Sequence, residues 1–190
     1  MIALVTHVGR AAGARAAAAA LACAAAEAER AALLVDLDGE RTPRPSLVAT
    51  AAARELEERL AAHLPGAAVA ARGRICVCAP SGEDDDARLE QVEAALPLAR
   101  ESLTAVHVPP SLLQRVLAEP RIRPDGALLR ADLPGSRALT ALAVCELIER
   151  RIETVVVKQP LAWLAARAAL LGALPPGADV LPRRAGRLLP

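Results

Sequence analysis

Aromatic side chains are nearly missing from this sequence, which contains no Phe, no Tyr and a single Trp. Its core must therefore be built from Leu, Val, Ile and many Ala residues. Each alanine contributes little apolar area. Lysine is also scarce, because Lys158 is the only one and the other basic residues are arginines. No motif that needs a lysine near the amino terminus is therefore complete.

The sequence lacks an excess of either charge. Its 23 Lys and Arg residues nearly balance 22 Asp and Glu residues, for a net charge of +1. This balance excludes a general binder of nucleic acid or other polyanions. With 190 residues and no internal repeat, the chain suits one domain. We expect a single α/β domain over residues 1–180 and a basic C-terminal tail over residues 181–190.

Long uninterrupted apolar runs are missing too. No segment has the ~18 consecutive apolar residues of a membrane span. Arg10 and Arg15 interrupt the Ala-rich first segment, and no basic region precedes it, which argues against a secretory signal. Pro182 and Gly186 interrupt the tail, so membrane contact is not expected either. We predict a cytoplasmic protein.

The four cysteines do not form a metal-binding pattern. Cys76 and Cys78 are two residues apart in a strand-like run, so they share a face but are not a C-x-x-C pair. Cys145 follows Ala141 and Val144 and precedes Ile148, which is the spacing of a helix face. This spacing predicts that Cys145 is a buried free thiol.

Short β-branched runs alternate with longer helical patterns along the chain. Several runs are apolar at consecutive positions, which is typical of parallel strands covered on both faces. The pattern predicts a three-layer, doubly wound, mostly parallel sheet with helices on both faces. The expected strands are 3–8, 32–37, 75–78, 103–108, 127–133 and 153–157, with a further edge strand before residue 74. The expected helices are 13–30, 46–64, 85–100, 111–119, 136–151 and 161–171, and Ser81 is the expected N-cap of the third.

Ligands of such sheets bind beyond the carboxyl ends of the strands. The polar residues expected at that edge are His7, Asp36, Asp38, Ser81, His107, Asp132 and Lys158. One interpretation is a metal-dependent enzyme, because imidazole and carboxylate groups together suit Zn²⁺ or Fe²⁺. Another is a small α/β hydrolase with Ser81 as nucleophile, although Ala79 and Glu83 replace the glycines of G-x-S-x-G.

The stretch VGRAAGAR lies between the first strand and the first helix. Gly9 and Gly13 permit a tight turn, and Arg10 and Arg15 add positive charge near a helix N-terminus, where anions bind. A working phosphate loop also needs a lysine and a Ser or Thr that binds Mg²⁺. Neither follows Gly13 here, so hydrolysis is not expected.

The longer stretch VTHVGRAAGARAAAAALACAAAEAERAALLVDLDGE resembles the start of ParA/MinD-type P-loop ATPases. In that family a K-G-G-V-G-K-T-T loop opens an Ala-rich helix and leads to a strand ending V-D-x-D. The resemblance puts Gly9 at the signature lysine and Gly13 at the last loop glycine. It puts Ala14 at the phosphate lysine, Arg15 at the Mg²⁺-binding hydroxyl and Asp36 at the switch aspartate.

Two later strands extend the resemblance in element order to about residue 160. AVHVPP is similar to the family's D-x-P-P strand, with His107 at the Mg²⁺-linked aspartate. VVVKQP is similar to the strand whose end contacts the base, with Val157 at the usual asparagine. The family implies a P-loop NTPase-like fold, but the groups that serve phosphate, metal and base are replaced.

The hypothesis from sequence is a non-catalytic ParA/MinD-like scaffold or regulator that acts by protein association. The family suggests positioning, cell division, or pilus or secretion assembly as its process. Nucleotide, metal and other cofactors are not expected; the partner is another protein or further copies of this chain. Gly9, Arg10, Gly13, Arg15 and Asp36 are then remnants of a nucleotide site. Lys158 and the lone Trp163 are the candidate interaction residues.

Overall fold

The computed structural model describes residues 1–8, 11–26, 31–38, 48–100, 103–131 and 137–157. Several sequence predictions lie outside these residues. They are the roles of Gly9, Arg10, Asp132, Lys158 and Trp163, the helix over 161–171 and the tail over 181–190.

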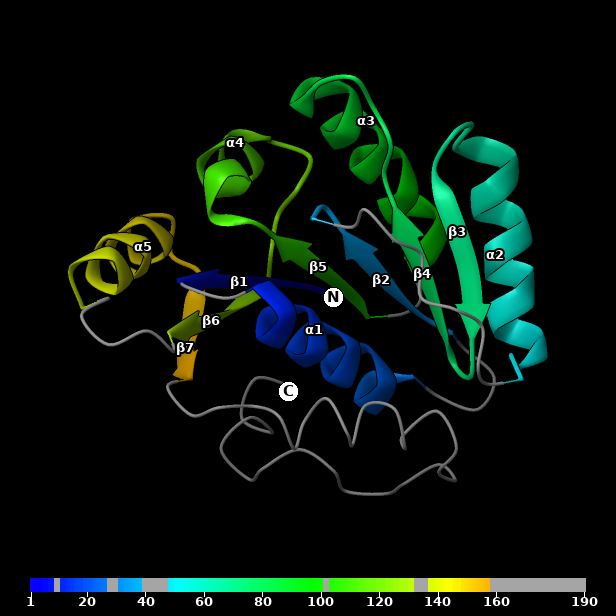
Figure 1. Ribbon diagram of the computed structural model, residues 1–190, viewed down its shortest axis with the longest axis horizontal. Helices are drawn as coiled ribbons and strands as arrows, with labels where there is room; N and C mark the ends of the chain where they lie inside the picture. Colours follow the sequence, from blue (N-terminus) through cyan, green and yellow to red (C-terminus); the bar gives the residue numbers. More distant parts are fainter. Residues whose placement is uncertain (9–10, 27–30, 39–47, 101–102, 132–136, 158–190) are drawn as a thin grey trace.

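The described residues form an α/β structure with a seven-stranded sheet and five α-helices (Figure 1). The sheet order is β3-β4-β2-β5-β1-β6-β7, and every neighbouring pair is parallel except β3 and β4. The strands are β1 (Ile2–Val8), β2 (Ala32–Asp36), β3 (Ala68–Arg72), β4 (Ile75–Ala79), β5 (Thr104–Val108), β6 (Gly126–Ala131) and β7 (Glu153–Val157). The helices are α1 (Ala11–Ala25), α2 (Ala51–His63), α3 (Asp85–Ala95), α4 (Leu113–Ala118) and α5 (Arg137–Glu149), with 3₁₀ turns η1 (Leu96–Ala99) and η2 (Pro110–Leu112).

Helices cover both faces of the sheet, as the apolar strands predicted. Figure 1 shows α1 alone on one face among the described helices, with α2 to α5 on the other. Successive strand residues contribute to the two faces in turn. Leu33 and Val35 of β2 belong to the core under α2, α3 and α4, whereas Leu34 packs with α1. The predicted mostly parallel sheet with helices on both faces is therefore confirmed, and β3 is the further edge strand expected before residue 74, which pairs antiparallel with β4.

The alanines of α1 let this helix lie close against the sheet. Ala14 and Ala18 have no exposed surface, and Ala17 and Leu21 are buried beside them. The helix begins at Ala11, two residues before the predicted start, so Gly13 is a helical residue. The positive-φ glycines among the described residues are Gly66 and Gly73. Gly13 therefore does not provide a left-handed turn.

The predicted start of α2 and the predicted N-cap of α3 were wrong, whereas α3 begins at residue 85 as predicted. The Thr50 hydroxyl caps α2, which begins at Ala51 and not at residue 46. The Asp84 carboxylate, not Ser81, caps α3 by accepting a hydrogen bond of 2.8 Å from the amide of Ala87. Ser81 instead donates its backbone N–H to Gln91 Oε1 at 2.8 Å. The acidic side chains after Ser81 include a better-placed cap, because the N-cap accepts from the residue three positions later.

Removing this cap gives a simple test. We expect Asp84→Ala to lower the free energy of unfolding by about 1 kcal/mol, because an amide of the first turn loses its acceptor. The matched control is Ser81→Ala, which removes an exposed hydroxyl and stays within about 0.5 kcal/mol of wild type. Urea unfolding followed by circular dichroism measures both values. A larger loss in Ser81→Ala than in Asp84→Ala would contradict the assignment.

The prediction that Cys145 is buried was also wrong. Cys145 is exposed on α5, and Ile148 of the same stripe is 60% exposed. The buried side of α5 is instead marked by Leu147, which has no exposed surface. Nine of the 13 residues of α5 are apolar and they occur around the helix, so their spacing did not show which side faces the sheet.

Candidate functional site

Polar side chains from four neighbouring strands meet at the carboxyl end of the sheet. They are Asp36 on β2, His107 on β5, His7 on β1 and Arg130 on β6, all buried. Strand alternation places each of them on the α1 face, because each follows by two residues an apolar side chain of the α1 core. Those four apolar residues are Leu34, Ala105, Val5 and Leu128.

The order of the strands makes this edge a natural site. The connection from β1 to β2 contains α1 and passes over β5. The connection from β5 to β6 contains α4 and passes over β1 in the other direction. The two connections lie on opposite faces (Figure 1). The ends of β1 and β5 are therefore a topological switch point, where ligands of open α/β sheets bind. His7 and His107 lie at this point.

Asp36 is the centre of the interactions at this edge. It is the register partner of His107, and its Oδ1 lies 2.7 Å from His107 Nδ1. Its other oxygen, Oδ2, lies 2.7 Å from Arg15 Nε. The backbone N–H of Asp38 also donates to Oδ1 at 3.2 Å. Both oxygens of this buried carboxylate are thus engaged by groups of the chain itself.

Arg15 joins the first helix to the second strand. Besides contacting Asp36, its Nη2 donates to the backbone carbonyl of Asp38 at 2.8 Å and lies 3.3 Å from Asp38 Oδ2. The Arg15 side chain is 42% exposed, but its guanidinium contacts both acidic residues that follow β2. An arginine cation therefore lies where two carboxylates converge.

Gly13 makes room for the side chain of Arg130. A Cβ atom built on Gly13 would overlap the Arg130 guanidinium. Arg130 is 6% exposed and is the register partner of His7 on β1. The start of α1 is therefore packed directly against a cation from β6, and the absence of a side chain at Gly13 permits this contact.

The two histidines stack rather than converge on a common point. Their ring centroids are 5.6 Å apart, and the planes differ by 19°. Because the Asp36 carboxylate only accepts, His107 Nδ1 carries the hydrogen of that bond. His107 has no exposed surface, so its imidazole does not reach a substrate in solvent. Among the described residues no three His, Cys, Asp or Glu side chains are arranged to hold a metal ion.

Ser81, the proposed nucleophile of the hydrolase interpretation, lies apart from the histidines. It is exposed after the end of β4, on the far side of β2 from β5 in the sheet order. Its backbone N–H bonds to Gln91. The structure therefore brings together the histidines and Asp36 but does not add Ser81 to them.

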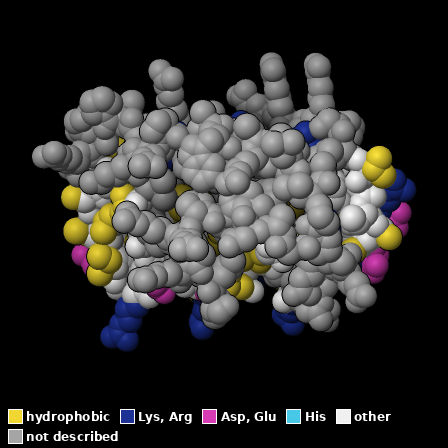
Figure 2. All heavy atoms as spheres, turned by 90° about the horizontal axis from the view of Figure 1, so that it is seen from below, with side chains coloured by type: hydrophobic (Ala, Val, Ile, Leu, Met, Phe, Trp, Pro, Cys, Tyr) yellow, Lys and Arg dark blue, Asp and Glu magenta, His cyan; other side chains and the backbone are white. Residues whose placement is uncertain are grey.

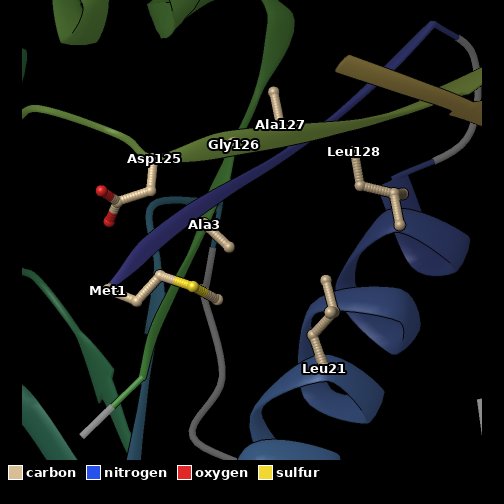
Figure 3. A pocket seen from close by; sticks show the side chains of 7 residues that line it. All are labelled: Met1, Ala3, Leu21, Asp125, Gly126, Ala127 and Leu128. Carbon is tan, nitrogen blue, oxygen red and sulfur yellow. The ribbon is translucent and has the colours of Figure 1, made fainter. Parts of the chain in front are cut away.

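Two hollows lie near β1, on different parts of the molecule. The larger, about 370 Å³, lies between β1, α4 and α5 and is bordered by Thr6, Leu113, Leu139 and Leu142 among others. The smaller, about 20 Å³, lies at the amino end of β1 (Figure 3). Leu21 of α1 is one of the apolar side chains that line it. Its volume is about that of one water molecule, so it is a packing gap of the Ala-rich core.

Of the predicted site residues, the structure describes Gly13, Arg15 and Asp36 and brings all three to this edge, together with His107. Arg130 was not among the predicted site residues. The sequence did contain a signal for Arg130. It is a charged residue in the apolar strand GALLRA, two positions after Leu128 and therefore on the same face of the strand. That signal indicates an inward-facing cation but not its contact with Gly13.

The sequence matches no protein-family model and no curated protein. The described helices include none with the length and apolar character needed to cross a bilayer.

Proposed function

We propose that this protein is a non-catalytic relative of the ParA/MinD ATPases, with a P-loop NTPase-like fold, that acts by association with other protein molecules. One observation carries the proposal. The carboxylate of Asp36, at the family's switch aspartate, is held by Arg15 and His107. Both partners stand at positions where the resemblance expects groups that serve Mg²⁺.

These residues do not fit a Mg²⁺–nucleotide complex. Mg²⁺ binds oxygen ligands in octahedral geometry, but Arg15 supplies a cation where the family has a hydroxyl. The guanidinium offers only hydrogen-bond donors, and it already pairs with Asp36 and Asp38. Ala14, at the position of the phosphate lysine, has no exposed surface. We derive no catalytic step through a nucleotide for this reason.

The positive charge of Arg15, near the start of α1, is paired within the site. Its guanidinium contacts the carboxylates of both Asp36 and Asp38, and a second guanidinium, that of Arg130, lies against Gly13. A triphosphate carries several negative charges and would have to displace these carboxylates from Arg15 to gain its attraction. The ion pairs therefore replace the metal's charge and tie α1 to β2. This supports a structural role for the former site, with scaffolding in cell positioning, division or secretion assembly as the proposed process.

Thermal unfolding with and without ATP and Mg²⁺ tests the proposal. A ligand present at 100 times its Kd adds about 2.7 kcal/mol of stability, which raises Tm by roughly 5–10 °C in a domain of this size. We expect no change in Tm with ATP and Mg²⁺ together. Tripolyphosphate without Mg²⁺ is the control for simple anion binding. A rise in Tm that requires both ATP and Mg²⁺ would contradict the proposal.

One contact favours the competing enzyme hypothesis, but the burial of that contact argues against it. The Asp36–His107 pair has the carboxylate–imidazole arrangement of a general base, but both groups are buried. Association is therefore the better-supported function, and the same melting series with Zn²⁺ or Fe²⁺ addresses the metal-dependent alternative.

A further inference from the structure

The larger of the two hollows, which we call the α4–α5 hollow, lies at the carboxyl end of β1. Thr6, His7 and Val8 of that strand border it, and the segment after β5 and helices α4 and α5 supply its other walls. Figure 1 shows both helices on the same face of the sheet, beside the end of β1. The hollow therefore lies at the topological switch point, where ligands of open α/β sheets bind.

The size and the walls of the α4–α5 hollow suit a small organic molecule. Its volume of about 370 Å³ falls in the range of about 300–1,000 Å³ for small-molecule sites. Leu113, Leu139 and Leu142 line it, and the last two are 61% and 67% exposed. Figure 2 shows exposed hydrophobic side chains at the left edge of the molecule, the side on which Figure 1 places α5. A ligand with an apolar body would cover part of this exposed leucine surface.

Thr6 places a buried hydroxyl at the floor of the hollow. The residue is 1% exposed, and its Oγ1 has no hydrogen-bond partner among the described residues. Strand alternation puts Thr6 on the same face as Leu4, which belongs to the core under α2, α3 and α4. An unpartnered buried hydroxyl costs stability, and valine has the same shape without that cost. The hydroxyl is therefore explained by a group that enters the hollow and bonds to it.

Glu146 gives the hollow a negative charge at its mouth. The side chain is half-buried and accepts a hydrogen bond of 3.2 Å from Nε2 of exposed Gln114, which joins α5 to α4. Among the described lining residues Glu146 is the only Asp, Glu, Lys or Arg. No described Lys or Arg pairs with it. The ring of His7 stacks on His107 at the α1 face. The charge of the hollow therefore favours a cation over an anion.

We propose that the α4–α5 hollow binds a small organic cation. Its ammonium group pairs with Glu146 at the mouth, its apolar body lies against the leucines, and a hydroxyl at its far end bonds to Thr6 at the floor. This binding goes beyond the proposed function and does not depend on it, because Asp36 and Arg15 lie on the opposite face of the sheet from the hollow.

Saturation-transfer NMR on the full chain tests the class of ligand. The probe is 4-(2-aminoethyl)phenol, which carries an ammonium and a hydroxyl at opposite ends of an apolar ring. The chain has no Phe or Tyr and one Trp, so the ring protons of the probe are read almost without overlap. We expect saturable binding with a Kd below about 1 mM.

Two related probes separate the contributions of the polar groups. 2-Phenylethylamine lacks the hydroxyl and is expected to bind about fivefold more weakly, the effect of one hydrogen bond. 3-(4-Hydroxyphenyl)propanoate has a carboxylate in place of the ammonium, and we expect no detectable binding. Equal binding of all three probes, or no binding of either amine, would overturn the proposal.

Variants of the two polar residues test their roles. Glu146→Gln is expected to raise the Kd of 4-(2-aminoethyl)phenol about tenfold, because the ammonium loses its counter-charge. The matched control is Glu149→Gln, which removes the same charge from an exposed residue of α5 that does not line the hollow, and it leaves the Kd unchanged. Equal effects of these two variants would show that the amine is attracted by the surface in general and would overturn the assignment of Glu146.

The variant Thr6→Val distinguishes a ligand contact from a structural role. We expect the Kd of 4-(2-aminoethyl)phenol to rise about fivefold and that of 2-phenylethylamine to stay unchanged, since only the first probe has a hydroxyl. Without ligand, Thr6→Val is expected to raise Tm by roughly 2–4 °C, because a buried unpartnered group is removed. A lower Tm would show that the hydroxyl serves the fold, and equal changes in Kd for both amines would show that it does not contact the ligand; either result would overturn the proposal.

Discussion

Replacing Asp36 by alanine is expected to lower the free energy of unfolding by about 2–3 kcal/mol, because a buried hydrogen-bond donor is left without its acceptor. The carboxylate is 4% exposed and holds His107 Nδ1 and Arg15 Nε, each at 2.7 Å. Without it, the buried N–H of His107 loses its acceptor. Part of Arg15 is exposed and regains water, so the loss comes mainly from the histidine and the packing around it.

The companion variants separate charge from hydrogen bonding. Asp36→Asn keeps an acceptor for His107 and is expected to lose less stability than Asp36→Ala. Asp38→Ala is the matched control, because Asp38 is 37% exposed and pairs with the same arginine; a loss under about 1 kcal/mol is expected. Urea unfolding at pH 7 measures all three. Equal losses at positions 36 and 38 would show that Asp36 is not the centre of the network.

Adding a methyl group at Gly13 is expected to destabilise the protein by about 2 kcal/mol, because the new Cβ overlaps the buried guanidinium of Arg130. Alanine otherwise favours a helix over glycine by up to about 1 kcal/mol. In an Arg130→Ala background the obstruction is gone. There Gly13→Ala is expected to be neutral or stabilising.

A double-mutant cycle on Gly13 and Arg130 isolates this contact. We expect a coupling free energy of about 2 kcal/mol, in the range for residues in direct contact. The single variants, the double variant and wild type are compared by urea unfolding, with Ala24→Gly on the exposed side of α1 as the control for helix propensity. A coupling free energy near zero would mean that the Arg130 side chain moves aside at no cost in stability. The contact with Arg130 would then not explain why residue 13 is a glycine.

The central strands were predictable because their consecutive apolar residues are buried on both faces of the sheet. Residues 153–157 were predicted as a strand with the bounds that β7 has, and the ends of β1, β2 and β5 differ by one residue. The positions of Asp36 and His107 at the sheet edge followed from these strands. Parallel strands end at the same edge, so the meeting of the two side chains was implied by the fold.

The contacts within the site were not predictable from the sequence. Register pairs Asp36 with His107 and His7 with Arg130, and register depends on all neighbouring strands together. Gly13 was predicted at the junction of a tight turn and the first helix, whereas in the structure it is the third residue of α1 and packs against Arg130. Helix α5 shows the same limit, since Cys145 and Leu147 have similar surroundings in sequence but opposite exposure.

Titration of the full chain with ATP and Mg²⁺ by isothermal calorimetry, with phosphate release followed in parallel, tests the non-catalytic assignment most directly. Arg15 pairs with Asp36 and Asp38, and the buried Ala14 stands where the family has the phosphate lysine, so we expect no heat of binding and no phosphate release. Micromolar binding together with Mg²⁺-dependent hydrolysis would contradict this account.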